Sequence, residues 1–292
     1  MTEPLFDSAF LRKLDQLSLL TRRAMTGEMQ GERRSPRRGT SVEFADFRPY
    51  TTGDDFRQID WNLYARMDRV FLKLFVAEEE LTIHLLIDSS TSMDWGMPNK
   101  FDYARRLGGA LSYISLSSLD RVTVTAFSMG NLQQLPGVRG KRGAIPLFLF
   151  LQKATAGGQG NLATACQRYV QTARTTGPLL LCSDLLDPGW QDALRTLASR
   201  SFEITLLHIL APQEIDPQIE GDFRLIDSEG GAPVEITADL DTLRRYHEHL
   251  ATWRAEVESF CSGRGITYLF ADTSVSVEDF VLSQMRKRSV LR

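Results

Sequence analysis

The sequence has few of the residues on which many enzymes and secreted proteins depend. Among its 292 residues there are 3 cysteines and 4 histidines. An odd number of cysteines without a CxxC spacing indicates neither a disulfide framework nor a zinc site, and is typical of a reducing cytoplasm. We expect these cysteines to be small buried apolar residues: Cys166, Cys182 and Cys261.

A basic excess and long apolar runs are also absent. The chain carries 34 Lys and Arg against 37 Asp and Glu, a net charge of −3, whereas dedicated nucleic-acid binders are usually basic. No apolar run approaches the roughly 20 residues that span a bilayer. Residues 1–17 lack the apolar core and small-residue cleavage site of a signal peptide. We therefore expect a globular cytoplasmic protein with no membrane span and no nucleic-acid partner.

What is present divides the chain into three segments. Residues 1–40 combine a helical spacing of apolar residues with a basic, Pro- and Gly-containing arm at 31–39. Residues 41–80, the signature region, interleave aromatic and charged residues, include a strand at 70–75, and are expected to be held by internal ion pairs. Residues 81–292 form the third segment, which we expect to be a separate domain.

The third segment alternates strand and helix patterns. Short apolar runs at 81–88, 178–184 and 202–210 are typical of buried parallel strands, and helical periodicity follows each of the first two. We expect a doubly wound, mostly parallel α/β sheet with helices on both faces, preceded by a smaller N-terminal region. The remaining predicted strands cover residues 121–128 and 266–271, a hairpin precedes residue 239, and predicted helices cover 100–119, 162–173, 190–198, 239–262 and 277–287.

Ligands of open α/β sheets bind beyond the carboxyl ends of the strands. Asp88, Ser90 and Ser92 follow the first apolar strand at alternate positions, so a tight loop can direct one carboxylate and two hydroxyls toward one point. Carboxylate and hydroxyl oxygens, completed by water, suit a hard cation such as Mg²⁺. Asp184, at the end of another strand, would add a carboxylate acting through water.

These residues resemble the DxSxS motif of von Willebrand factor A domains, which forms their metal-ion-dependent adhesion site. The resemblance implies that Asp184 corresponds to the Asp of the third metal-binding loop. The second loop departs from the family pattern, because Gly160 stands where a Thr ligand belongs and Asn161 replaces Asp. Asn161 would then offer a carbonyl oxygen to the metal, or water would take that position.

The signature region resembles the domain-of-unknown-function 58 family. The resemblance extends from about residue 41 to 184 and implies a non-enzymatic protein–protein interaction module. Such proteins are typically found beside MoxR-type AAA+ ATPases, so the implied partner is such an ATPase, its client protein, or both. The matching residues are Glu43, Phe44, Arg48, Tyr50, Gly53, Asp54, Asp55, Arg57, Ile59, Asp60, Trp61, Ala65 and Arg66.

Two alternatives stay open. In the first, the metal site is degenerate, the α/β domain is a scaffold, and the partner docks on the basic arm and the signature region. In the second, the chain is a haloacid-dehalogenase-like phosphatase with a strand-end Asp nucleophile at Asp88. Such enzymes carry a second Asp two residues later as general acid, and position 90 is Ser.

Overall fold

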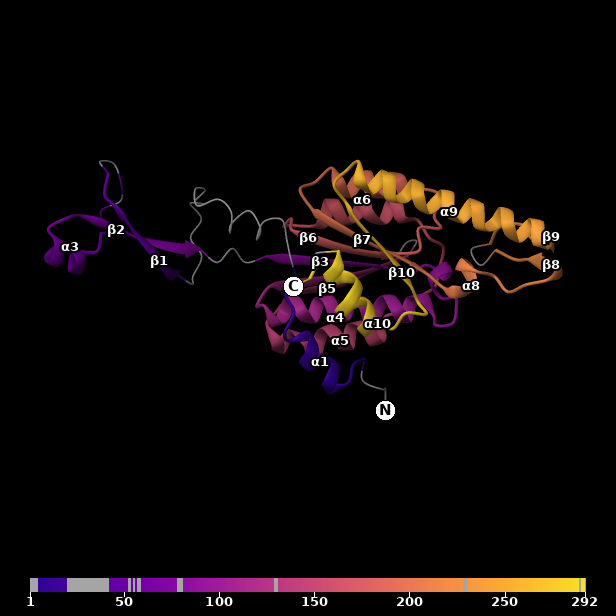
Figure 1. Ribbon diagram of the computed structural model, residues 1–292, viewed down its shortest axis with the longest axis horizontal. Coiled ribbons are helices and arrows are strands. Elements are labelled where there is room, and N and C mark those ends of the chain that lie inside the picture. Colours follow the sequence, from indigo (N-terminus) through magenta and orange to yellow (C-terminus); the bar gives the residue numbers. More distant parts are fainter. Residues whose placement is uncertain are drawn as a thin grey trace. The chain divides into compact units, whose positions relative to one another are not determined.

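The residues described by the computed structural model form two compact units (Figure 1). The model describes residues 5–19, 42–51, 54, 56, 59–77, 81–128, 131–227, 230–288 and 290–291. The larger unit combines residues 5–19 with those from 81 onward, and the smaller one lies between residues 42 and 77.

A six-stranded sheet forms the centre of the larger unit. Its strand order is β10-β7-β6-β3-β4-β5, and all neighbouring pairs are parallel except β4 with β5. The chain therefore winds outward in both directions from β3, and the switch in direction falls between β3 and β6. The strands are β3 (Thr82–Asp88), β4 (Arg121–Ser128), β5 (Asn131–Arg139), β6 (Pro178–Ser183), β7 (Glu203–Leu210) and β10 (Thr267–Asp272).

Helices cover both faces of this sheet because alternate strand residues are apolar on each side. In β3, Ile83, Leu85 and Ile87 enter one core and Leu86 enters the other. The first core contains side chains of α1 (Ser8–Leu14), α4 (Lys100–Ser117), α5 (Ala144–Lys153) and the last helical segment (α10, Val277–Asp279, continuing as a π-helix over Phe280–Met285). The second contains side chains of α6 (Leu162–Thr172), α7 (Trp190–Ala198) and α9 (Leu240–Ser262). The predicted α/β class and helices on both faces are confirmed (Figure 1).

The N-terminal helix belongs to the first of these cores. Phe10 and Leu14 of α1, with Leu17 after it, are buried beside α4. Sequence analysis grouped this helix with the basic arm, whereas contacts place it with the α/β unit. Residues 31–39 of the arm lie outside the described residues.

Sequence analysis did not predict β5 and α5 of the larger unit. β5 contains Pro136 and Gly137, which weaken a strand pattern, but it lies at the sheet edge, where a missing backbone donor is tolerated. α5 follows it after a short 3₁₀ turn and buries only Ala144, Leu147 and Leu151. The predicted hairpin is confirmed as β8 (Gly221–Leu225) paired antiparallel with β9 (Val234–Ala238).

The smaller unit is an antiparallel strand pair with one short helix. β1 (Val42–Pro49) pairs with β2 (Phe71–Ala77), and α3 (Trp61–Met67) lies between them in the chain. Asp60 begins α3 by accepting hydrogen bonds from the backbone N–H groups of residues 62 and 63, at 2.9 and 3.1 Å. The Arg48 guanidinium donates to Asp54 Oδ1 at 2.6 Å. Hydrogen bonds from Thr51, and next the Arg48 charge, lower the pKa of Asp54 to about 2. These carboxylates therefore have structural partners, as an ion-paired region predicts.

The larger unit also accounts for the cysteines. Cys166, Cys182 and Cys261 are free thiols buried in its two cores. Burial raises the pKa of each thiol, so they act as apolar packing residues, as predicted. Within the described parts of the chain, every helix is too short or too polar to cross a membrane.

Candidate functional site

Three loops meet at the carboxyl edge of the sheet, where the strand order reverses. The first loop follows β3 and contains Asp88, Ser90 and Ser92; the third follows β6 and begins with Asp184. The glycine-rich second loop is hydrogen-bonded to the first, since Gly157 N–H donates to the Ser89 carbonyl at 2.8 Å and the Thr91 N–H donates to the Gly158 carbonyl at 2.9 Å. Gly158 has a φ of 85°, which explains why glycine suits this turn.

Asp88 is buried and held from two directions. Its Oδ1 accepts the Ser90 N–H at 3.0 Å, and its Oδ2 accepts the Ser183 hydroxyl at 2.7 Å. Burial, and next the charge of Asp184, raise the pKa of Asp88 to about 7, although both hydrogen bonds oppose this. The Asp88 carboxyl group is thus fixed in position, and none of the basic side chains that the structure describes pairs with it.

The hydroxyls of Ser90 and Ser92 lie side by side. Their Oγ atoms are 3.0 Å apart, and Ser90 is 2% exposed. Two adjacent hydroxyls with a carboxylate on the same loop are oxygen donors of the kind that Mg²⁺ accepts. By this test, the residues of the first loop fit the ion that the sequence predicts.

Asp184 has a partner that sequence analysis did not find. The Lys100 ammonium, on the first residue of α4, donates to Asp184 Oδ2 at 2.8 Å and to Glu214 Oε1 at 2.5 Å. The Lys100 side chain is 0% exposed and that of Asp184 1%. Glu214, on α8 (Pro212–Ile215), also accepts the Ala211 N–H at 2.8 Å. This cluster of three charges, the Lys100 cluster, ties together the segments that follow β3, β6 and β7.

His208 holds the backbone of the third loop at Asp184. It bonds the Asp184 backbone carbonyl through Nε2 at 3.1 Å and the Tyr268 hydroxyl through Nδ1 at 2.9 Å. Because a carbonyl only accepts, Nε2 carries the proton and Nδ1 accepts. Burial lowers the pKa of His208 to about 3. The ring is therefore neutral and structural, as a histidine inside an apolar strand predicts.

The Asn161 side chain caps a helix. Its Oδ1 accepts the Thr164 N–H at 2.9 Å and so caps the N-terminus of α6. The same helix start is held by Asp187 of the third loop, whose Oδ2 accepts the Leu162 N–H at 2.9 Å. Metal ligation by Asn161 stays a prediction, and this amide oxygen would have to serve the helix and the ion together.

Large apolar side chains are exposed on the loops of this edge. Trp95 and Met97, between the first loop and α4, are 46% and 79% exposed, and Leu186, two residues after Asp184, is 51% exposed. Gln213 of α8 fixes the Met97 backbone by one bond in each direction, at 3.1 and 2.8 Å. This edge thus combines buried polar side chains with exposed apolar ones, and hydrogen bonds hold the backbone that carries them. Protein-binding surfaces often have this combination.

Sequence analysis missed Lys100, Ser183 and Glu214. One signal for Lys100 was available: a lysine at the first position of a helix opposes the helix dipole and needs a compensating anion. Ser183 precedes Asp184 directly, but its bond to Asp88 spans 95 residues. Glu214 bonds Lys100 across 114 residues, and no local pattern encodes that contact.

Comparison with known proteins identifies the family of the chain. Residues 46–256 match the family described as Protein of unknown function DUF58. The chain belongs to this family. The DUF58 match runs from the signature region into α9 and includes all five predicted metal-site residues.

Individual relatives are more distant. Uncharacterized protein Rv1480 of Mycobacterium tuberculosis (strain ATCC 25618 / H37Rv) is 26% identical over 290 residues, which cover 96% of this DUF58 chain and 91% of that protein. A solved structure of conserved hypothetical protein BatB from Bacteroides thetaiotaomicron has a TM-score of 0.43 and 17% identity, and covers 72% of this chain and 98% of its own. An aerotolerance-related membrane protein from Bacteroides fragilis NCTC 9343 has a TM-score of 0.42 and 18% identity, with coverages of 71% and 99%. Likenesses this remote transfer no function to the chain.

Proposed function

We propose that this chain is a non-catalytic protein-binding module of the von Willebrand A-like type, which docks its partner at the carboxyl edge of the central sheet. The observation that carries the proposal is the composition of that edge. The fixed carboxylate and hydroxyl oxygens of Asp88, Ser90 and Ser92 lie on the first loop, and exposed apolar side chains follow at Trp95 and, on the third loop, at Leu186.

A divalent cation is part of this proposal. Asp88, Ser90 and Ser92 would hold Mg²⁺, Asp184 would contribute through water, and Asn161 would supply the remaining protein oxygen. Bound there, the ion supplies a Lewis-acidic position for a carboxylate of the partner. Charge supports this: the Lys100 ammonium is already shared by Asp184 and Glu214, His208 is neutral, and among the described residues no basic side chain pairs with Asp88.

The partner we propose is a MoxR-type AAA+ ATPase, its client protein, or both. The support is the family resemblance of the signature region, together with a docking edge whose backbone is held by the Lys100 cluster. An adaptor benefits from such a supported surface, because less conformational entropy is lost when the partner binds.

The surroundings of Asp88 favour binding over catalysis. A phosphatase nucleophile needs an accessible carboxylate oxygen and a neighbouring acid. Asp88 is 4% exposed, both its oxygens accept hydrogen bonds, and position 90 is Ser. The phosphatase alternative therefore predicts hydrolysis of a general phosphatase substrate that Asp88→Asn abolishes. We expect no hydrolysis by the wild type or by Asp88→Asn.

The smaller unit offers a second docking surface. Phe56, Trp61 and Met67 are 66%, 62% and 57% exposed, and the Trp61 and Tyr64 rings pack edge to face with centroids 6.2 Å apart. Exposed aromatic groups of this kind are common at interfaces. In the scaffold alternative this surface, and the basic arm, would bind the partner while the carboxyl edge stays unused.

The deciding experiment measures capture of the ATPase from host lysate by the tagged chain, in Mg²⁺ and in EDTA. We expect capture by the wild type in Mg²⁺, and loss with both Asp88→Asn and Leu186→Ser. Ile145→Ser, a change at a 69% exposed apolar residue of α5, is the matched control and should bind as wild type. Because the ATPase itself needs Mg²⁺, the Asp88→Asn variant separates the two requirements. Equal capture by wild type, Asp88→Asn and Leu186→Ser would reject the carboxyl edge as the docking surface.

A further inference from the structure

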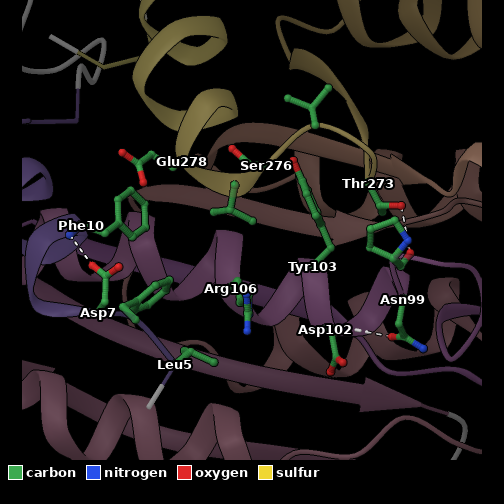
Figure 2. A pocket seen from close by; sticks show the side chains of 14 residues that line it. Leu5, Asp7, Phe10, Asn99, Asp102, Tyr103, Arg106, Thr273, Ser276 and Glu278 are labelled. Atoms are coloured by element: carbon green, nitrogen blue, oxygen red, sulfur yellow. Dashed lines mark hydrogen bonds between the residues drawn. The ribbon is translucent and has the colours of Figure 1, made fainter. Parts of the chain in front are cut away.

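A pocket of about 440 Å³ lies away from the carboxylate and hydroxyl cluster, within the larger unit. Figure 2 shows its 14 lining residues, which come from three places: the segment that begins α1, the first turns of α4, and the connection from β10 into α10. Its size is within the range of small-molecule sites. Six of the lining residues are apolar, and they form its walls: Leu5, Phe6, Phe10, Pro98, Val275 and Val277.

Six of the eight polar lining residues already have partners inside the protein. Asp7 caps α1 through the Phe10 N–H, Asn99 caps α4 through the Asp102 N–H, and Ser276 caps α10. Thr273 donates to the Pro98 carbonyl at 2.9 Å. The two remaining carboxylates are ion-paired, Asp102 with Arg105 and Glu278 with Lys13.

The two polar residues left over are both donors. Tyr103 is 5% exposed, and its hydroxyl has no hydrogen-bond partner among the described residues. Its side chain extends through the pocket toward Ser276 (Figure 2). Arg106, three residues further along α4, lines the same pocket with an exposed side chain, and no carboxylate or carbonyl of the described residues accepts from its guanidinium. A buried hydroxyl without a partner costs free energy, and a ligand acceptor would recover it.

We propose that this pocket binds a small monocarboxylic acid with an apolar body. One carboxylate oxygen accepts from Arg106 and the other from the Tyr103 hydroxyl, while the apolar body packs against the rings of Phe6 and Phe10 and the side chain of Val277. Because the acids that line the pocket are already engaged and add negative charge at its rim, a second anionic group on the ligand would be repelled. The proposal is independent of the docking function of the carboxyl edge.

The test uses three probes of one shape: 4-phenylbutyrate, its neutral amide and 4-phenylbutylamine. Binding to the full chain is followed by calorimetry and by chemical-shift changes of the pocket residues. We expect the acid to bind about tenfold more tightly than the amide, because the carboxylate forms an ion pair with the Arg106 guanidinium, whereas the neutral amide oxygen only accepts a hydrogen bond from it. The amine should show no saturable binding.

Two variants locate the ligand in the pocket. Arg106→Gln should reduce acid binding about tenfold and amide binding by much less, because only the acid loses an ion pair. Tyr103→Phe should weaken acid binding several-fold without lowering stability, since it removes a buried hydroxyl that has no partner. Arg142→Gln is the control, because Arg142 is an exposed arginine that does not line the pocket.

Three results would overturn the proposal: equal affinity for acid, amide and amine; an Arg106→Gln variant that binds the acid as Arg142→Gln does; or no saturable binding of any probe. A peptide ending in phenylalanine serves as a further arm. If its free-acid form bound more tightly than 4-phenylbutyrate and its amide did not, the carboxylate chemistry would stand, with a peptide terminus as its source.

Discussion

The two units use the same residue types, carboxylates and basic groups, in opposite ways. In the larger unit, Lys100 bonds Asp184 and Glu214 across 84 and 114 residues with side chains that are 0–16% exposed. In the smaller unit, Arg48 bonds Asp54 across six residues, and their side chains are 32% and 20% exposed. Long-range buried pairs connect the elements of a tertiary fold, whereas local pairs stabilise single turns. Loss of one buried pair should therefore destabilise the whole carboxyl edge, whereas loss of a local pair in the smaller unit should affect only the turn that contains it.

The sharpest test of this comparison is the pair Lys100→Met and Arg48→Met. Removing the Lys100 ammonium leaves two largely buried carboxylates without their positive partner, which should lower the free energy of unfolding of the larger unit by about 3–5 kcal/mol. Arg48→Met should cost at most about 1 kcal/mol, because its pair is partly exposed to water. Urea unfolding followed by circular dichroism measures both.

The double variant Lys100→Met/Asp184→Asn is the control for this explanation. With one charge removed from each side, part of the lost stability should return. If Lys100→Met cost no more than Arg48→Met, the Lys100 cluster would not hold the edge together, and the contrast between the units would collapse.

The second prediction concerns pH. Acid should lower the free energy of unfolding of the larger unit more than that of the smaller unit, but by less than Lys100→Met does. His84 is buried in β3 beside the Tyr169 hydroxyl, 2.6 Å away, and burial lowers its pKa to about 4. An unfolded histidine titrates near 6.5, so between these values the unfolded chain binds more protons than the folded one. The stability contributed by neutral His84 is thus complete above about pH 6.5 and is lost as the pH falls. We expect a loss of about 2 kcal/mol between about pH 7 and about pH 5.

The measurement is unfolding at both pH values for wild type and His84→Gln, with hydrogen exchange to resolve the units. His84→Gln should remove its own part of the pH dependence and leave the part that comes from His208, whose pKa burial also lowers. Every histidine of the chain lies outside residues 26–80. Acid sensitivity of the smaller unit equal to that of the larger one would contradict this account.

The sequence was sufficient for the elements that carry a regular pattern. β3, α4 and β6 lie within a residue or two of their predicted bounds, because continuous apolar runs and an Asn99 cap are local signals. The rule that ligands bind at strand ends also predicted that the Asp88 and Asp184 loops lie close together, because the neighbouring parallel strands β3 and β6 end at the same edge of the sheet. Local pattern and topology suffice to place the loops of the site.

The features that could not be predicted from the sequence depend on contacts between residues that are distant along the chain. The bond from Ser183 to Asp88 and the bonds of Lys100 require the register of β6 against β3 and the exact start of α4. Apolar residues recur at helical spacing along α9, but only some of them are buried: Val257 is fully buried, whereas Tyr246 is 38% exposed. A helical period shows which face is apolar, but the extent of its burial depends on how far the sheet beneath it reaches.

Helix caps provide a third, intermediate test. Asn161→Ala removes the cap of α6 and Asp60→Ala that of α3, and each should cost about 1 kcal/mol. The two caps differ in one respect, since Asn161 is also a predicted metal ligand. Titration with Mg²⁺ should stabilise wild type more than Asn161→Ala if Asn161 ligates the ion. An equal Mg²⁺ effect would leave Asn161 as a cap only. Asp60→Ala should respond as wild type in either case.

The smallest effect on stability distinguishes the two docking surfaces. Trp95 and Trp61 are 46% and 62% exposed, one on the carboxyl edge and one on the smaller unit. Because neither is in a core, Trp95→Ala and Trp61→Ala should each change the free energy of unfolding by no more than about 0.5 kcal/mol. A loss of partner binding in either variant would then reflect the surface and not the fold. We expect Trp95→Ala to lose the captured ATPase and Trp61→Ala to retain it; the reverse result would move the docking site to the smaller unit and make the α/β domain a scaffold.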